Sequence, residues 1–133
     1  MKHIAMLLFG LALSVPAFAQ QPISSAGWLN TNCKAAQNPP ITDATAMDAG
    51  MCDGFMIGWR DGVIGLLVMD KGKPVQILMA DGVTIGQMER VFITYMAAHP
   101  ELENKTADFV LSQSLSNAGL VGTKPLPVPI TTN

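Results

Sequence analysis

The sequence predicts an all-α fold: a small bundle of about four helices with one disulfide and an extended, proline-rich C-terminal tail. Apolar residues recur at helical spacing in separate stretches, and prolines and glycines divide these stretches from one another. The chain has 133 residues, of which 49% are hydrophobic and 14% are charged. This composition favours one folded domain and excludes a disordered chain.

Residues 1–19 have the pattern of a cleaved export signal. Lys2 and His3 precede an apolar run that Pro16 ends, and a small-x-small motif follows at residues 17–19. The apolar run is too short to span a membrane as a helix. We therefore predict cleavage between Ala19 and Gln20, a periplasmic location and no membrane attachment after cleavage.

The exported chain is predicted to have two parts, a helical domain over residues 20–120 and a tail over residues 121–133. Prolines at every second position, from 125 to 129, favour polyproline II and exclude a helix in the tail. Cys33 and Cys52 are the only cysteines. In an oxidising compartment they are expected to form a disulfide, and two buried free thiols are the alternative.

The first two helices are expected over residues 25–36 and residues 43–69. Asn38-Pro39-Pro40 ends the first, because a proline pair cannot continue a helix. Thr42 or Asp43 is a suitable N-cap for the second. A stripe on the second helix is expected to face the core; its members are Met47, Met51, Phe55 and Trp59.

Glycines recur every four residues along this second helix, at Gly50, Gly54, Gly58 and Gly62. Each glycine in a helix interior costs about 0.5–1 kcal/mol relative to alanine, so a compensating contact is expected. The spacing forms one ridge that permits close approach of another helix. That helix belongs either to the same chain or to a second copy in a homodimer.

Residues 70–82 are predicted to separate the second and third helices. Lys71-Gly72-Lys73-Pro74 is typical of a turn, and residues 75–79 are expected to be extended or one helical turn. We predict no sheet, because a single extended segment would have no partner strand. The third helix begins with a capping box of Thr84 and Gln87 and ends at His99-Pro100, and a fourth covers residues 106–118.

No catalytic, cofactor or metal motif is present in the sequence, so we predict neither an enzyme nor a bound cofactor. His99 is the only histidine after the signal, and its place before a proline favours helix capping over general-base catalysis. Asp48, Asp53 and Asp61 are spaced too unevenly to form paired carboxylates. A formal charge of −2 argues against nucleic acid as a partner.

Three sequence blocks resemble the Rap/Tai family of type VI secretion immunity proteins, across most of residues 33–120. The blocks are CDGFMIG at residues 52–58, DGVTIGQ at residues 81–87, and residues 91–101, which hold Tyr95 and the run His99-Pro100-Glu101. The resemblance implies a periplasmic, helical protein that binds a cell-wall amidase effector and occludes its active site. It also implies a homodimer.

Members of this family typically have two disulfides, and this chain has one cysteine pair. Leu78 and the pair Leu120-Val121 stand where the second bridge is found in many members. The resemblance therefore implies that Leu78 and Val121 pack together as an apolar pair in place of that bridge.

Occlusion of a cleft requires a protruding polar segment, and residues 70–81 are predicted to supply it. The predicted contact residues are Asp70, Lys71, Lys73, Gln76 and Asp81. The competing surface is the acidic side of the second helix, which carries Asp48, Asp53 and Asp61. An alternative function is a chaperone-like or structural periplasmic protein with no toxin partner, whose methionines provide adaptable contacts.

Overall fold

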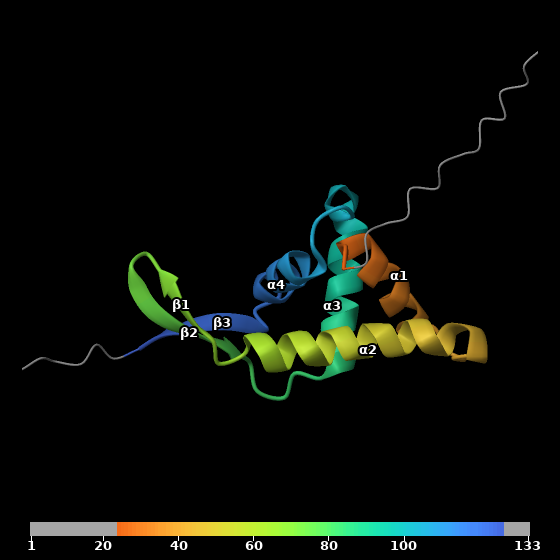
Figure 1. The fold of residues 1–133 in the computed structure, drawn as a ribbon, viewed down its shortest axis with the longest axis horizontal. Helices are drawn as coiled ribbons and strands as arrows, with labels where there is room; N and C mark the ends of the chain where they lie inside the picture. The colour runs from red at the N-terminus through yellow and green to blue at the C-terminus, as the bar shows by residue number, and fades with distance from the viewer. Residues whose placement is uncertain (1–23, 127–133) are drawn as a thin grey trace, which may run out of the picture.

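The computed structural model describes residues 24–126, and within them the fold is mixed (Figure 1). Four α-helices and a three-stranded antiparallel sheet are present, so the predicted all-α fold is wrong. The helices are α1 (Ala26–Gln37), α2 (Asp43–Val63), α3 (Ile85–Ala98), the short 3-10 helix η1 (Pro100–Leu102) and α4 (Ala107–Asn117). The strands, in spatial order, are β1 (Leu67–Asp70), β2 (Lys73–Met79) and β3 (Val121–Pro125).

The second helix ends at Val63, earlier than predicted, because the chain turns directly into the sheet. Ile64 is extended and Gly65 has a φ of +89°, a left-handed conformation that favours glycine. The Gly65 amide then donates to the Ile77 carbonyl oxygen at 2.8 Å. Cross-strand hydrogen bonds thus replace the helical ones, and residues 67–70 form a strand instead of a last helical turn.

The middle strand β2 has a partner on each side, which the sequence did not reveal. On one side Val75 pairs with Val68 of β1, and on the other side it pairs with Pro125 of β3. The polyproline prediction is therefore wrong for residues 121–125; the rest of that prediction, residues 127–133, lies outside the described residues. Pro125 fits this arrangement because β3 is an edge strand, where a residue without an N–H group is tolerated.

The expected packing of Leu78 on Val121 is also wrong. In the β2–β3 register Leu78 lies opposite Gly122, and Val121 lies opposite Met79. Neighbouring residues on a strand point to opposite faces, so the side chains of Leu78 and Val121 lie on different faces of the sheet. Met79 and Val121 pack against the core instead.

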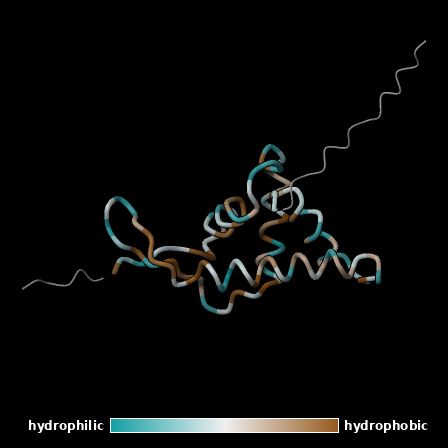
Figure 2. Tube along the Cα trace, viewed as in Figure 1, coloured by the Kyte–Doolittle hydropathy of each residue, from teal (hydrophilic) through white to brown (hydrophobic). Residues whose placement is uncertain are grey.

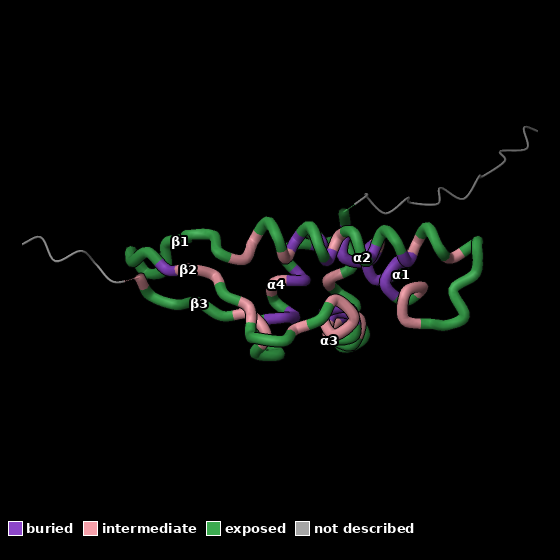
Figure 3. The backbone as a smooth tube through the Cα atoms, turned by 90° about the horizontal axis from the view of Figure 1, so that it is seen from below, coloured by how far each residue is buried: buried purple, intermediate pink, exposed green. Residues whose placement is uncertain are grey.

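Helix α2 runs along the molecule, and the other three α-helices lie on one side of it (Figures 1 and 3). The predicted disulfide between Cys33 of α1 and Cys52 of α2 is present, with a Cα–Cα distance of 4.9 Å. Both cysteines are buried in the apolar core. The core's largest fully buried side chains are Phe92, Leu29, Met56, Met88, Leu111, Leu115 and Val110.

The face that α2 turns to the core is not the predicted stripe. Met47 is 70% exposed and Met51 is also exposed, whereas Trp59 is buried. The buried residues of α2 are Ala49, Cys52, Met56 and Trp59. Their alternating spacing of three and four follows the 3.6-residue repeat, while a strict spacing of four drifts off the core face.

The helices start within one residue of the predicted positions, and the described hydrogen bonds include the Thr84 half of the predicted Thr84–Gln87 capping box. The hydroxyl of Thr84 accepts from the Gln87 amide at 3.2 Å, and that of Ser25 accepts from the Trp28 amide at 3.1 Å. Thr42 is the N-cap residue of α2. No helix within residues 24–126 is both long enough and apolar enough to cross a membrane.

Candidate partner-binding hairpin

Strands β1 and β2 form a hairpin that projects beyond the end of α2, away from the helices (Figure 1). Lys71 and Gly72 connect the strands, and their φ angles are +49° and +77°. A two-residue turn with two positive φ angles matches the right-handed twist of the flanking strands. Because β3 also pairs with β2, the base of the hairpin is fixed to the rest of the domain.

The predicted contact residues divide between the tip and the base of this hairpin. Asp70 and Lys73 lie opposite each other at the end of the ladder, and Lys71 lies in the turn between them. All three are exposed. Gln76 is half-buried in β2 between Leu67 and Lys124, so it is a poor contact residue.

Asp81, the fifth predicted residue, lies in the exposed loop between β2 and α3. It lines an open hollow of about 530 Å³ together with Arg60 and Asp61 from the end of α2. The Arg60 Nε atom is 2.8 Å from the Asp61 Oδ1 atom. This hydrogen bond and the charge of Asp61 raise the pKa of Arg60. The structure thus brings Asp81 close to one of the acidic residues of the competing surface.

A row of exposed apolar side chains lies on the hairpin, and the sequence pattern does not predict it. Leu67 is 63% exposed and Met69 is 69% exposed, and the neighbouring Leu66 is also exposed. Figure 2 shows that the hairpin is hydrophobic along β1 and hydrophilic at its tip, and Figure 3 shows that most of it is exposed. The sequence predicts a helix over residues 43–69, and the helical spacing there gives no indication that Leu66, Leu67 and Met69 are exposed.

The acidic residues of the competing surface do not form a cluster. Asp53 and Asp61 are exposed and Asp48 is half-buried, at separate places along α2. Asp53 contributes to the raised pKa of Glu89 on α3. The three carboxylates of the competing surface therefore form no compact acidic patch.

The glycine ridge lies on the exposed side of α2. A Cβ atom built on Gly50, Gly54, Gly58 or Gly62 would meet no other atom within 4 Å. Within the described residues the ridge therefore packs against no other helix. The predicted partner of the ridge is either a helix of the same chain or a second copy, and only the second copy agrees with this exposure.

His99 is the C-terminal cap of α3, and its ring stacks on Tyr95 with a centroid distance of 4.3 Å. Its Nδ1 atom is 3.1 Å from the Glu101 Oε1 atom. Hydrogen bonds from the Glu101 backbone and from His99 lower the pKa of Glu101. Among residues 24–126, no group of His, Cys, Asp and Glu side chains is arranged to hold a metal ion.

Comparison with known proteins gives one match. The family described as Rap1a immunity proteins matches residues 25–118, a range that begins at the N-cap of α1 and ends at the C-cap of α4. No curated protein and no solved structure matches the chain. Because the match covers more than half of the sequence, the chain belongs to the Rap1a immunity protein family.

Proposed function

We propose that this chain is the periplasmic immunity protein of a type VI secretion system, and that it binds and occludes a cell-wall amidase effector. Family membership supports binding of a protein effector. The amidase identity comes from the sequence resemblance. The observation that carries the occlusion mechanism is the exposed hairpin formed by β1 and β2, whose second strand also pairs with β3.

The hairpin is suited to entering a cleft because it is narrow and held in one conformation. The β1–β2 ladder fixes its two strands, and β3 fixes β2 from the other side. A segment that is already ordered loses less conformational entropy on binding. Lys71 and Lys73 at the tip provide positive charge, and Leu67 and Met69 provide apolar contact area.

A tip variant tests this mechanism. We expect Lys71→Asn with Lys73→Gln to weaken inhibition of the effector amidase roughly tenfold, because two charged contacts are lost. Asparagine readily adopts the positive φ of position 71, so the turn is preserved. The measurement is release of peptidoglycan fragments by the cognate effector amidase, at increasing concentrations of each variant.

The matched control removes two lysines far from the hairpin, Lys34→Gln with Lys105→Gln. Both lysines are exposed, and the change in net charge is the same. Equal inhibition by the tip variant and this control contradicts the hairpin assignment. If instead Asp48→Lys with Asp61→Lys slows association in a salt-dependent way, the acidic side of α2 is the binding surface.

We also propose that the glycine ridge forms the seam of a homodimer. Exposed Met47, Met51 and Ile57 lie on α2 with the ridge, so two such faces would bury apolar surface between copies. The absence of Cβ atoms allows two helix backbones to approach closely.

The substitution Gly58→Leu separates this seam from the fold of one copy. We expect the variant to be a folded monomer at concentrations where the parent is a dimer, because a leucine at the seam keeps the helices apart. Nothing in the same chain lies within 4 Å of the added Cβ atom, so the helix itself is preserved. Light scattering after size exclusion gives the mass, and an unchanged dimer mass rules out the ridge as the seam.

The alternative function is a chaperone-like binding protein with no toxin partner. Exposed Met47, Met51 and Met69 favour it, because methionine side chains adapt to varied partners. This function predicts that the protein suppresses aggregation of unrelated unfolded proteins. An immunity protein is expected to leave such aggregation unchanged and to inhibit its own effector.

A further inference from the structure

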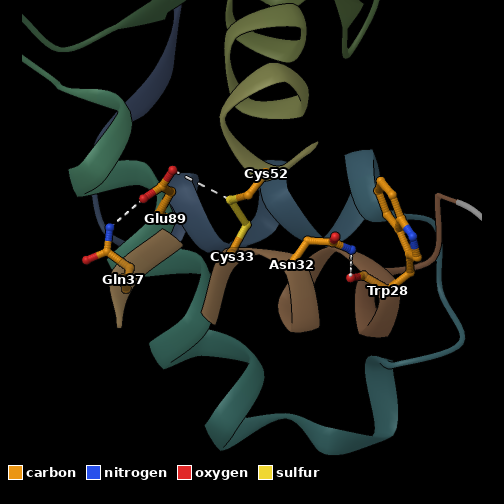
Figure 4. Close-up of a disulfide and its surroundings, with 6 residues drawn as sticks. All are labelled: Trp28, Asn32, Cys33, Gln37, Cys52 and Glu89. Carbon is orange, nitrogen blue, oxygen red and sulfur yellow. Dashed lines mark hydrogen bonds between the residues drawn. A yellow bond between two sulfur atoms is a disulfide. The ribbon is translucent and has the colours of Figure 1, made fainter. Parts of the chain in front are cut away.

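A buried carboxyl group lies where three helices meet. Glu89 of α3 is 2% exposed, and it points toward α1 and α2 beside the Cys33–Cys52 disulfide (Figure 4). Glutamate is almost never this buried unless it is paired with a positive charge. Glu89 has no part in the hairpin mechanism, and it lies on the opposite side of α2 from the glycine ridge.

The neighbours of Glu89 are better suited to its neutral form than to its ionised form. One carboxyl oxygen, Oε2, accepts a hydrogen bond from the Gln37 amide of α1. The other oxygen, Oε1, is 3.6 Å from the Cys52 sulfur, which carries no hydrogen because it is part of the disulfide. An ionised carboxylate here would have lost its water and gained one neutral donor, which is an unfavourable exchange.

The charged groups around Glu89 come from two helices. Asp53 of α2 is a second carboxyl group and disfavours a negative charge on Glu89. Arg90, the next residue of α3, favours that charge, but its side chain is exposed to solvent. From α1 the Gln37 amide donates to Oε2 and so favours the ionised form, but burial, which favours the neutral form, has the larger effect.

We propose that Glu89 is a pH-sensitive clamp at the junction of α1, α2 and α3: its protonated form is accommodated in this buried position, and its ionisation there weakens the junction. The clamp sits beside the disulfide that links the first two of these helices. The three-helix junction is therefore most stable in mildly acidic conditions.

The direction of the effect follows from the carboxyl group itself. Burial, and then the interaction with Asp53, raise the pKa of Glu89 from an ordinary 4.5 to about 7. A group whose pKa is raised on folding stabilises the native state fully below its unfolded pKa, and this stabilisation is lost as pH rises through the folded pKa. The contribution of Glu89 is thus present near pH 4.5 and disappears above about pH 7.

The test compares unfolding of the parent and Glu89→Gln by urea between pH 5 and pH 8. Glutamine has the shape of the protonated glutamate and cannot ionise. Relative to the variant, we expect the unfolding equilibrium constant of the parent to rise roughly fiftyfold to a hundredfold over this range. The two proteins are expected to converge at pH 5, and the variant is expected to be more stable at pH 8.

Two further proteins make the result specific to Glu89. Glu103→Gln removes an exposed carboxyl group and is expected to keep the pH dependence of the parent. Asp53→Asn removes the neighbouring carboxyl group and is expected to shift the midpoint toward lower pH. Parallel pH profiles for the parent and Glu89→Gln overturn the proposal.

A direct titration decides the question even where Glu89→Gln does not fold. The ¹³C chemical shift of the Glu89 carboxyl carbon in the parent protein follows its protonation. A midpoint near pH 7 supports the clamp, whereas a midpoint near pH 4.5 overturns it.

Discussion

Replacing Phe92 with alanine is expected to lower the free energy of unfolding by about 3–5 kcal/mol. Phe92 lies on α3 and is fully buried in the same cluster as Leu29 of α1 and Met56 of α2. Removing its ring loses the transfer free energy of the buried carbon atoms and leaves a cavity that the surrounding helices fill only in part. Urea unfolding followed by circular dichroism measures the change.

Phe109→Ala is the matched control, since the same ring is removed from α4 at a position that is 49% exposed. We expect it to lower the free energy of unfolding by less than about 1 kcal/mol, because little buried area is lost and no closed cavity forms. Similar losses for the two variants would show that α3 is not the centre of the core.

The disulfide is expected to have the second-largest effect on stability. Replacing both cysteines, as Cys33→Ala with Cys52→Ala, is expected to lower the free energy of unfolding by about 3 kcal/mol. The bridge closes a loop between residues 19 positions apart and so restricts the unfolded chain. Its loss also removes two buried sulfur atoms from the contact between α1 and α2.

Reduction of the parent protein serves as the control for this variant. Reductant is expected to destabilise the parent by a similar amount and to leave the double variant unchanged. Free-thiol titration of the denatured, unreduced parent is expected to find no thiol, since the two cysteines are joined. If the double variant is as stable as the oxidised parent, the bridge is not what holds α1 on α2.

Neither stability prediction involves the hairpin, and this separation helps to interpret the functional tests. The tip residues Lys71 and Lys73 are exposed and lie outside the apolar core. Loss of inhibition by the tip variant at unchanged unfolding free energy therefore reports binding. Loss of inhibition by the Phe92 variant reports unfolding.

Much of the helical part of this fold is determined by the sequence itself. Capping residues and helix breakers act over a few residues, so the starts of α1 and α3 and the end of α4 near Gly119 are predictable from local chemistry. The pairing of Cys33 with Cys52 is predictable for a different reason. With only two cysteines, the choice lies between one bridge and none.

The sheet was decided by the tertiary structure alone. Strand β2 pairs with β1 through a short turn, but its other partner, β3, comes after two more α-helices and η1. Such a distant hydrogen-bonding partner leaves no mark on the local pattern, and the run at residues 64–69 is equally apolar as a helix or as a strand. The tip residues of the predicted binding segment are exposed, whereas the exposed apolar side chains of β1 could not be predicted from the sequence pattern.

The exposed glycine ridge and the buried Glu89 are two further features whose burial only the tertiary structure decides. The glycine spacing predicts that another helix packs closely against α2. Only the tertiary structure shows that no helix among the described residues does so, because the ridge lies on the outside of the bundle. Nothing around Glu89 in the sequence indicates burial, because Gln37 and Cys52 reach it from other helices. Local chemistry determined where the helices begin and end, and long-range packing decided which of their faces are buried.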